Sequence, residues 1–276
     1  MTRTNKPLED LTAQARRLRA HVVRMVASLR VGYLLQGLGA ADIFAALYFD
    51  ELNLDPADPA WPERDRFILS TAHNTALLYA TFAERGLIAV EALDTYTRDG
   101  SPLEVNASER MGPIVEATCG SLGQGLSVAL GMALSLRRRG SAARVYVVLG
   151  DGELQEGQVW EAALSAGSHG LDNLCLIIDR NYLQVEGHTD KVVAMDPIDA
   201  KFAAFGWAAS LIDGNDLGQI IGALDQARRV RGRPSAIIAQ TRPGAGVPFL
   251  EGQMAHVAFI SQEDAARALA HLEPAA

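Results

Sequence analysis

The chain has 276 residues, of which 49% are hydrophobic, 6% aromatic and 21% charged, a composition that excludes a disordered or collagen-like chain. A net charge of −8 argues against nucleic acid as a partner, because phosphate backbones need a basic surface. The polar N-terminus and the lack of long uncharged apolar stretches predict neither export nor a membrane span. Two widely separated cysteines, Cys119 and Cys175, favour a cytoplasmic protein.

Several stretches have apolar residues at spacings of three and four, which predicts helices. The N-terminal stretch has a glycine-containing break before Ala41, so it predicts two helices joined by a glycine loop. Prolines between Asp50 and Asp65 predict a surface connection, and Gly100–Gly125 is loop-like. The expected helices lie within 11–49 (as a pair), at 75–85, up to 139, at 156–168 and at 217–230.

Short runs rich in β-branched and apolar residues alternate with these helices, which predicts βαβ units. We therefore expect an α/β fold: a parallel sheet with helices on both faces. Residues 1–276 are expected to form a single domain with helical N-terminal and C-terminal extensions. The runs lie at 67–70, 144–149, 174–179, 207–212 and 235–240.

Polar residues follow two of these runs directly. Gly150-Asp151-Gly152 comes after one run, and Asn181 comes after the next, one helical crossover later. Residues just past the ends of parallel strands line the ligand crevice, so the Asp151 carboxylate and the Asn181 amide are expected at one edge. Mg²⁺ prefers such oxygen ligands and shares them with phosphates. Alternatively, Asp151 only caps a strand-to-helix turn.

These motifs resemble the transketolase family. A Gly-Asp-Gly segment with an asparagine one crossover later is similar to the thiamine-diphosphate motif, and the surrounding residues are similar to transketolases in particular. The similarity extends over about residues 11 to 270, in the order and spacing of the family. The segments that carry it are 39–43, 65–73, 120–134, 150–167, 176–187 and 241–251.

The resemblance implies a thiamine-diphosphate-binding fold of the type that holds the diphosphate (PP-type domain). Thiamine diphosphate and Mg²⁺, or Ca²⁺, are the implied cofactors. A longer transketolase chain continues with a pyrimidine-binding domain, which carries the glutamate that activates the cofactor. We therefore expect an N-terminal subunit of a split enzyme, with a separate pyrimidine-domain partner and an α2β2 assembly.

The resemblance also assigns roles to single residues. Asp151, Asn181 and the backbone carbonyl of Leu183 match the metal ligands. Glycines are expected beside the cofactor because they let the backbone come close. The residues implied to bind the cofactor are His73, Gly120, Ser121, Leu122, Gly123, Gly150, Asp151, Gly152, Glu153, Asn181 and Leu183.

His73 and His256 match active-site histidines of the family and are the candidate catalytic residues, since imidazole donates, accepts and titrates near neutral pH. Glu156, with Glu161, matches acids at the subunit contact, where the family has a proton path between paired active sites. Glu156 is therefore a third catalytic candidate.

Two histidines of the family pattern are replaced in this chain. Tyr33 and Asn106 stand where transketolases have histidines. Neither supplies a proton at pH 7 as imidazole does, although both can hydrogen-bond a neutral group. Together with His256 they are the candidate substrate-binding residues. We expect an altered donor or acceptor.

Three functions remain open. The first is two-carbon ketol transfer from a small-molecule ketose by a transferase of aldehyde or ketone residues (EC 2.2.1.-), active only with its partner. The second is transfer of a two-carbon hydroxyacyl unit to a lipoyl group or an acyl-carrier protein. The third is a non-catalytic cofactor-binding scaffold. A 2-oxoacid dehydrogenase α subunit shares the metal motif, but the residues at 120–125 and 150–157 argue against it.

Overall fold

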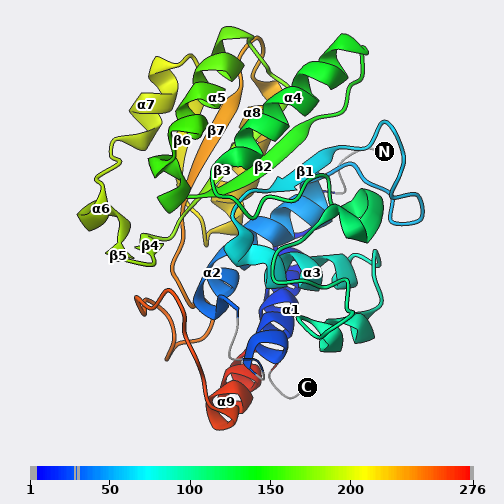
Figure 1. Ribbon diagram of the computed structural model, residues 1–276, viewed down its shortest axis with the longest axis vertical. Helices are drawn as coiled ribbons and strands as arrows, with labels where there is room; N and C mark the ends of the chain where they lie inside the picture. Colours follow the sequence, from blue (N-terminus) through cyan, green and yellow to red (C-terminus); the bar gives the residue numbers. More distant parts are fainter. Residues whose placement is uncertain (1–4, 28, 30–31, 274–276) are drawn as a thin grey trace.

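The computed structural model describes residues 5–27, 29 and 32–273, and shows a parallel five-stranded sheet between layers of helices (Figure 1). The strand order is β1-β2-β3-β7-β6. This confirms the predicted α/β fold, and the strands lie within one residue of the expected positions. They are β1 (Arg66–Leu69), β2 (Val145–Gly150), β3 (Leu174–Arg180), β6 (Ala208–Asp213) and β7 (Ser235–Gln240).

Side chains alternate between the two faces of the sheet and fill a core on each. Tyr146 and Val148 of β2 join one apolar cluster, while Val145 and Val147 join the other. This two-residue period lets helices cover both faces. The first face is covered by α1 (Leu8–Ala27), α2 (Leu34–Ala46), α3 (Thr75–Glu84) and α8 (Leu217–Arg229), and the second by α4 (Gln124–Arg138), α5 (Gly157–Ser168) and α7 (Ile198–Ala204).

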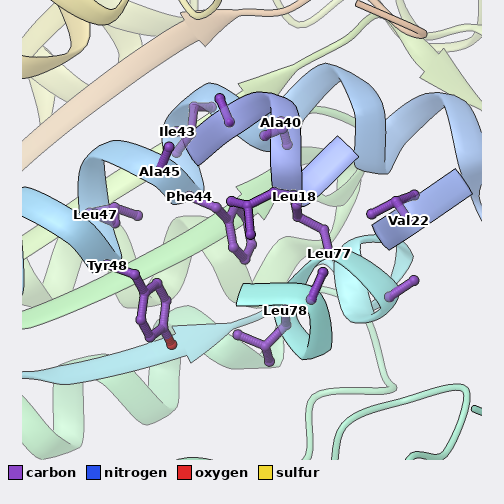
Figure 2. Close-up of a cluster of buried hydrophobic side chains, with 14 of the residues drawn as sticks. Leu18, Val22, Ala40, Ile43, Phe44, Ala45, Leu47, Tyr48, Leu77 and Leu78 are labelled. Atoms are coloured by element: carbon purple, nitrogen blue, oxygen red, sulfur yellow. The ribbon is translucent and has the colours of Figure 1, made fainter. Parts of the chain in front are cut away.

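Figure 2 shows the interior of the first layer. Leu18 of α1, Phe44 of α2 and Leu77 of α3 are fully buried and point toward one another. Tyr48 extends the same cluster from a short π-helical turn, Leu47–Glu51, with its ring 5.1 Å from that of Phe67. This packing holds the C-terminal end of α2 against α1, α3 and β1.

The expected start of the second helix at Ala41 is wrong. α2 begins at Leu34 and runs through Gly37 and Gly39. A Cβ at Gly39 would lie 2.9 Å from the Arg242 carbonyl oxygen, so glycine there permits close packing instead of breaking the helix.

The remaining elements were only partly expected. A small hairpin, β4 (Leu183–Gln184) and β5 (Gly187–His188), follows β3 and leads into α6 (Thr189–Val192). The C-terminal helix α9 (Gln262–Leu272) packs against α1 (Figure 1). None of the helices in the described part of the chain is long and apolar enough to cross a membrane.

Candidate functional site

A cleft opens at the carboxyl edge of the sheet, where β2 and β3 end. Gly150 pairs with Asp179 in the register of these strands, so the residues that follow them lie side by side. The cleft encloses about 810 Å³ of empty space, part of it open to solvent, which is within the usual range for small-molecule sites. Of the predicted residues, it is lined by His73, Leu122, Gly150, Asp151, Gly152, Glu153, Glu156, Asn181, Leu183 and His256.

The Asp151 carboxylate is buried at the end of β2 and accepts hydrogen bonds through both oxygens. Its Oδ1 accepts a hydrogen bond from the Gly152 amide at 3.0 Å, which caps the short 3-10 turn Gly152–Gln155. Its Oδ2 accepts from the Tyr182 amide and from Thr189 Oγ1, each at 2.9 Å. Asp151 therefore serves as a cap and also binds the loop after β3.

Burial raises the pKa of Asp151 to about 7. Within the described ranges, neither Lys nor Arg lines the cleft to balance its charge. A buried carboxylate without a cationic partner is costly, and a divalent cation is a common source of the missing charge.

The Asn181 side chain is held in one orientation. Its Nδ2 donates to Asp179 Oδ2 at 3.2 Å, while its Oδ1 accepts from the Leu183 amide at 2.9 Å. The fully buried Asp179 is held in turn by Asn74 Nδ2 and Thr241 Oγ1. Because the nitrogen of the Asn181 amide is bonded to Asp179, the amide oxygen is the atom that a ligand can contact.

The donor set fits a hard cation. It comprises one carboxylate, one amide oxygen and the carbonyl of Leu183, all oxygens of the kind that Mg²⁺ and Ca²⁺ take. In the part of the chain described, no group of three or more His, Cys, Asp or Glu side chains suits a metal ion.

Gly152 leaves space that a side chain would occupy. A Cβ built there would meet only Gln184, at 3.5 Å, which is ordinary contact. Packing within the protein therefore does not require glycine at this position. Since Gly152 lines the cleft, its missing side chain favours the close approach of a ligand.

Glu153 joins three segments beneath the cleft. Its Oε1 accepts from Ser70 Oγ at 2.6 Å and from the Gly123 amide at 2.8 Å, and its Oε2 accepts from the Gly150 amide at 2.8 Å. Both carboxylate oxygens are thus occupied within the protein. Glu153 positions the glycine loop against the ends of β1 and β2.

Three rings gather on one side of the cleft. The ring centroids of Tyr33 and His73 are 4.5 Å apart, those of His73 and His256 4.8 Å, and those of Tyr33 and His256 5.2 Å. Burial, together with the neighbouring His256, lowers the pKa of His73 to about 4, and burial lowers the pKa of His256. Both imidazoles are therefore neutral at pH 7.

Residues 11–273 match a family described as "Transketolase, thiamine diphosphate binding domain". This chain belongs to the transketolase family. It is 40% identical to a 6-deoxy-6-sulfo-D-fructose transketolase subunit from Clostridium sp. (strain MSTE9), with 96% of both chains covered. It is 38% identical to an apulose-4-phosphate transketolase subunit from Actinobacillus succinogenes, with 90% of both chains covered.

Solved transketolases have the same fold. The Campylobacter jejuni enzyme superimposes with a TM-score of 0.86 at 30% identity, covering 97% of this chain and 47% of that one. The Leishmania mexicana enzyme gives a TM-score of 0.84 at 28% identity, covering 97% of this chain and 41% of that one. The chain thus spans less than half the length of these transketolases.

Some residues predicted from the transketolase motifs lie away from the cleft. Asn106 is exposed over a separate hollow beside Gly120, and Gly120 and Ser121 are exposed without lining the cleft. Glu156 is exposed at the start of α5 and lines the cleft, whereas Glu161 is exposed on the same helix outside it.

The fold brings two further polar residues to or beside the cleft that the sequence motifs did not predict. Asp179 and Gln36 are buried polar residues that contact Asn181 and His256, respectively. Asp179 could have been predicted, because an acidic residue at the end of an otherwise apolar strand is unusual. Gln36 has no comparable signal, because its contact joins residues 220 positions apart.

Proposed function

We propose that this chain is the thiamine-diphosphate-binding subunit of a two-chain transketolase, which transfers a two-carbon ketol unit from a ketose. One observation carries the proposal: the oxygen donors of Asp151 and Asn181 and the neutral pair His73 and His256 line the same cleft. The first pair suits a metal-bound diphosphate, and the second suits the hydroxyl groups of a sugar.

Asp151, Asn181 and the Leu183 carbonyl would hold Mg²⁺, and Ca²⁺ is an alternative because it takes the same oxygen ligands. Gly152 and the 120–123 loop would lie beside the diphosphate. When bound, thiamine diphosphate supplies the carbon nucleophile for breaking and forming bonds next to a carbonyl group. Glu153 and Asp179 keep the glycine loop and Asn181 in place before any ligand arrives.

In this proposal His73 and His256 bind the sugar and transfer protons. Because both are neutral at pH 7, each imidazole can donate one hydrogen bond and accept another. They can therefore bind adjacent hydroxyl groups of a sugar and move a proton to or from an oxygen. Tyr33, in contact with both rings, limits the space beside them.

A second polypeptide completes the proposed enzyme. Two relatives named as transketolase subunits are matched over 90% or more of their length, whereas the solved transketolases are matched over less than half. The partner would contribute the pyrimidine-binding domain, in an α2β2 assembly. Glu156 is exposed and lines the cleft, and in this proposal it would face that partner.

The substrate is proposed to differ from that of common transketolases. Tyr33 replaces a family histidine within the ring cluster, so one proton-exchanging group is lost where the sugar would lie. The relatives described above are named for 6-deoxy-6-sulfo-D-fructose and apulose 4-phosphate, which are unusual sugars, and they match this chain over nearly their whole length. We propose a ketose of this kind as the donor.

The test uses the chain purified together with a pyrimidine-domain transketolase subunit from the same organism. Calorimetry should show thiamine diphosphate binding that requires Mg²⁺, and coupled assays should show ketol transfer to ribose 5-phosphate. Asp151→Ala should abolish both, while the control Asp199→Ala, at an exposed position of α7, should change neither.

Cofactor binding without transfer from any ketose would favour the scaffold function. Acylation of an added carrier protein in place of ribose 5-phosphate would favour hydroxyacyl transfer. Full activity with xylulose 5-phosphate would show that Tyr33 does not redirect the substrate. Retained binding in Asp151→Ala would overturn the metal site.

A further inference from the structure

Gln36 connects the first turn of α2 to the segment that carries His256. Its side chain is 2% exposed and lines the same cleft as Asp151 and Asn181. Its Nε2 donates to the backbone carbonyl of His256 at 2.9 Å and lies 3.4 Å from Nδ1 of the same residue. One amide group therefore contacts both the backbone and the ring of His256.

These contacts determine the orientation of both side chains. The His256 carbonyl can only accept, so the Gln36 nitrogen must face it and the amide is not free to flip. The same nitrogen beside Nδ1 favours the tautomer in which Nδ1 accepts and Nε2 carries the proton. His256 is thereby prepared as a donor through Nε2.

The other end of the Gln36 amide has no partner. Its Oε1 is buried and accepts no hydrogen bond from the described residues. A buried acceptor without a donor is costly, so such atoms commonly receive a hydrogen bond from a ligand. In a cleft proposed to bind a sugar, a hydroxyl group is the donor of suitable chemistry.

We propose that Gln36 is a specificity-determining residue: it positions His256 as an Nε2–H donor and accepts a hydrogen bond from a ketose hydroxyl group through Oε1. The second part rests on the proposed function, whereas the first concerns the protein alone. Neither a transketolase motif nor the ring cluster identifies Gln36 as part of the site.

The first part is tested on the purified chain without cofactor, by long-range proton–nitrogen NMR of the His256 ring. Tyr33, His73 and Glu186 also face or influence this ring, so the comparison is made at fixed pH between variants. Wild type should show the Nε2–H tautomer. Gln36→Met should shift the population toward Nδ1–H, and Gln36→Glu should do so further while raising the pKa of His256.

The matched control is Gln155→Met, because Gln155 lines the same cleft but donates to Gln184. It should leave the His256 signals unchanged. Identical His256 spectra in wild type and Gln36→Met, at native fold by circular dichroism, would overturn the positioning role. An equal change in the Gln155 variant would overturn it as well.

The second part is tested in the complex with the partner subunit. Gln36→Met should raise KM for the ketose donor about tenfold, the effect of losing about 1.4 kcal/mol of hydrogen bonding, with an unchanged Kd for thiamine diphosphate and Mg²⁺. An unchanged KM would overturn the hydroxyl contact. If no ketose is turned over by the wild type, the proposed function and the hydroxyl contact fail together, while NMR still decides the positioning of His256.

Discussion

The Asp179 carboxylate receives a hydrogen bond from the Asn181 amide, with Nδ2 and Oδ2 3.2 Å apart. The two residues stand at the end of β3 and directly after it, and Asp179 is fully enclosed by the protein. The carboxylate also accepts hydrogen bonds from Asn74 and Thr241, which lie on two other segments. The orientation of a proposed metal ligand therefore depends on a residue outside the ligand set.

Replacing Asp179 with Asn should weaken the metal site and the fold together. The new amide nitrogen would face a donor from Asn74, Asn181 or Thr241, leaving a buried group unpaired at a cost of about 1–3 kcal/mol. The free energy of unfolding, measured with urea, should fall by that amount. Mg²⁺-dependent binding of the cofactor, measured by calorimetry, should weaken at least about tenfold.

The control for Asp179 is Thr241→Val, which removes the hydrogen bond to Oδ1 and keeps the contact with Asn181. It should lower stability while leaving cofactor affinity within about twofold, because Asn181 keeps its orientation. Equal losses of affinity in both variants would show that Asp179 acts only through stability.

Gly152→Ala should separate folding from binding. The added Cβ meets Gln184 only at ordinary distance, so the free energy of unfolding should change by less than about 0.5 kcal/mol. The methyl group would occupy cleft space, so thiamine diphosphate affinity should fall about tenfold or more. Gly157→Ala, with open space around its Cβ, is the control and should change neither quantity. Normal cofactor binding to Gly152→Ala would contradict close approach at this position.

His73 should make stability depend on pH. Its folded pKa of about 4 lies below the ordinary value of 6.5, so between these values the unfolded chain binds more protons than the folded one. The free energy of unfolding should therefore fall as pH falls from 6.5 toward 4. His73→Gln should flatten the part of this dependence that comes from His73, as measured by urea unfolding at several pH values.

NMR titration provides a second measurement on His73. Its ring signals should stay at the neutral position from pH 8 to pH 5. In His256→Gln the pKa of His73 should rise, since the nearby imidazole lowers it. A His73 signal that titrates near 6.5 in wild type would contradict the burial argument.

Tyr33→His should restore a family group in the ring cluster. An imidazole at this position would donate, accept and titrate near neutral pH. We expect kcat/KM for xylulose 5-phosphate to rise about tenfold relative to the natural donor, which is less than the roughly 100-fold or larger contribution of a fully positioned acid or base. Tyr33→Phe keeps the ring contacts and removes only the hydroxyl, so it should not produce this gain.

Local sequence was sufficient for the strands of the main sheet, for most of the helices that cover it and for part of the site. The apolar runs and helical periods predicted the sheet because buried parallel strands and their crossover helices each need a continuous apolar surface. The placement of Asp151 and Asn181 near each other was predicted from topology, since neighbouring parallel strands end at the same edge of the sheet. The prediction of a helix break at Gly39 was wrong, because this glycine lies within α2. Its lack of a side chain makes room for the Arg242 carbonyl, a contact that local sequence does not indicate.

The sequence by itself determined the layered α/β fold, the family and the oxygen donors at the strand ends, because these depend on periodicity and on motifs that are local in the chain. Only the tertiary structure decided which polar groups support them. Gln36 reaches His256, and Glu153 reaches Ser70, across long sequence separations. Such contacts leave no local pattern, because burial and hydrogen-bond geometry are created only when distant segments pack together.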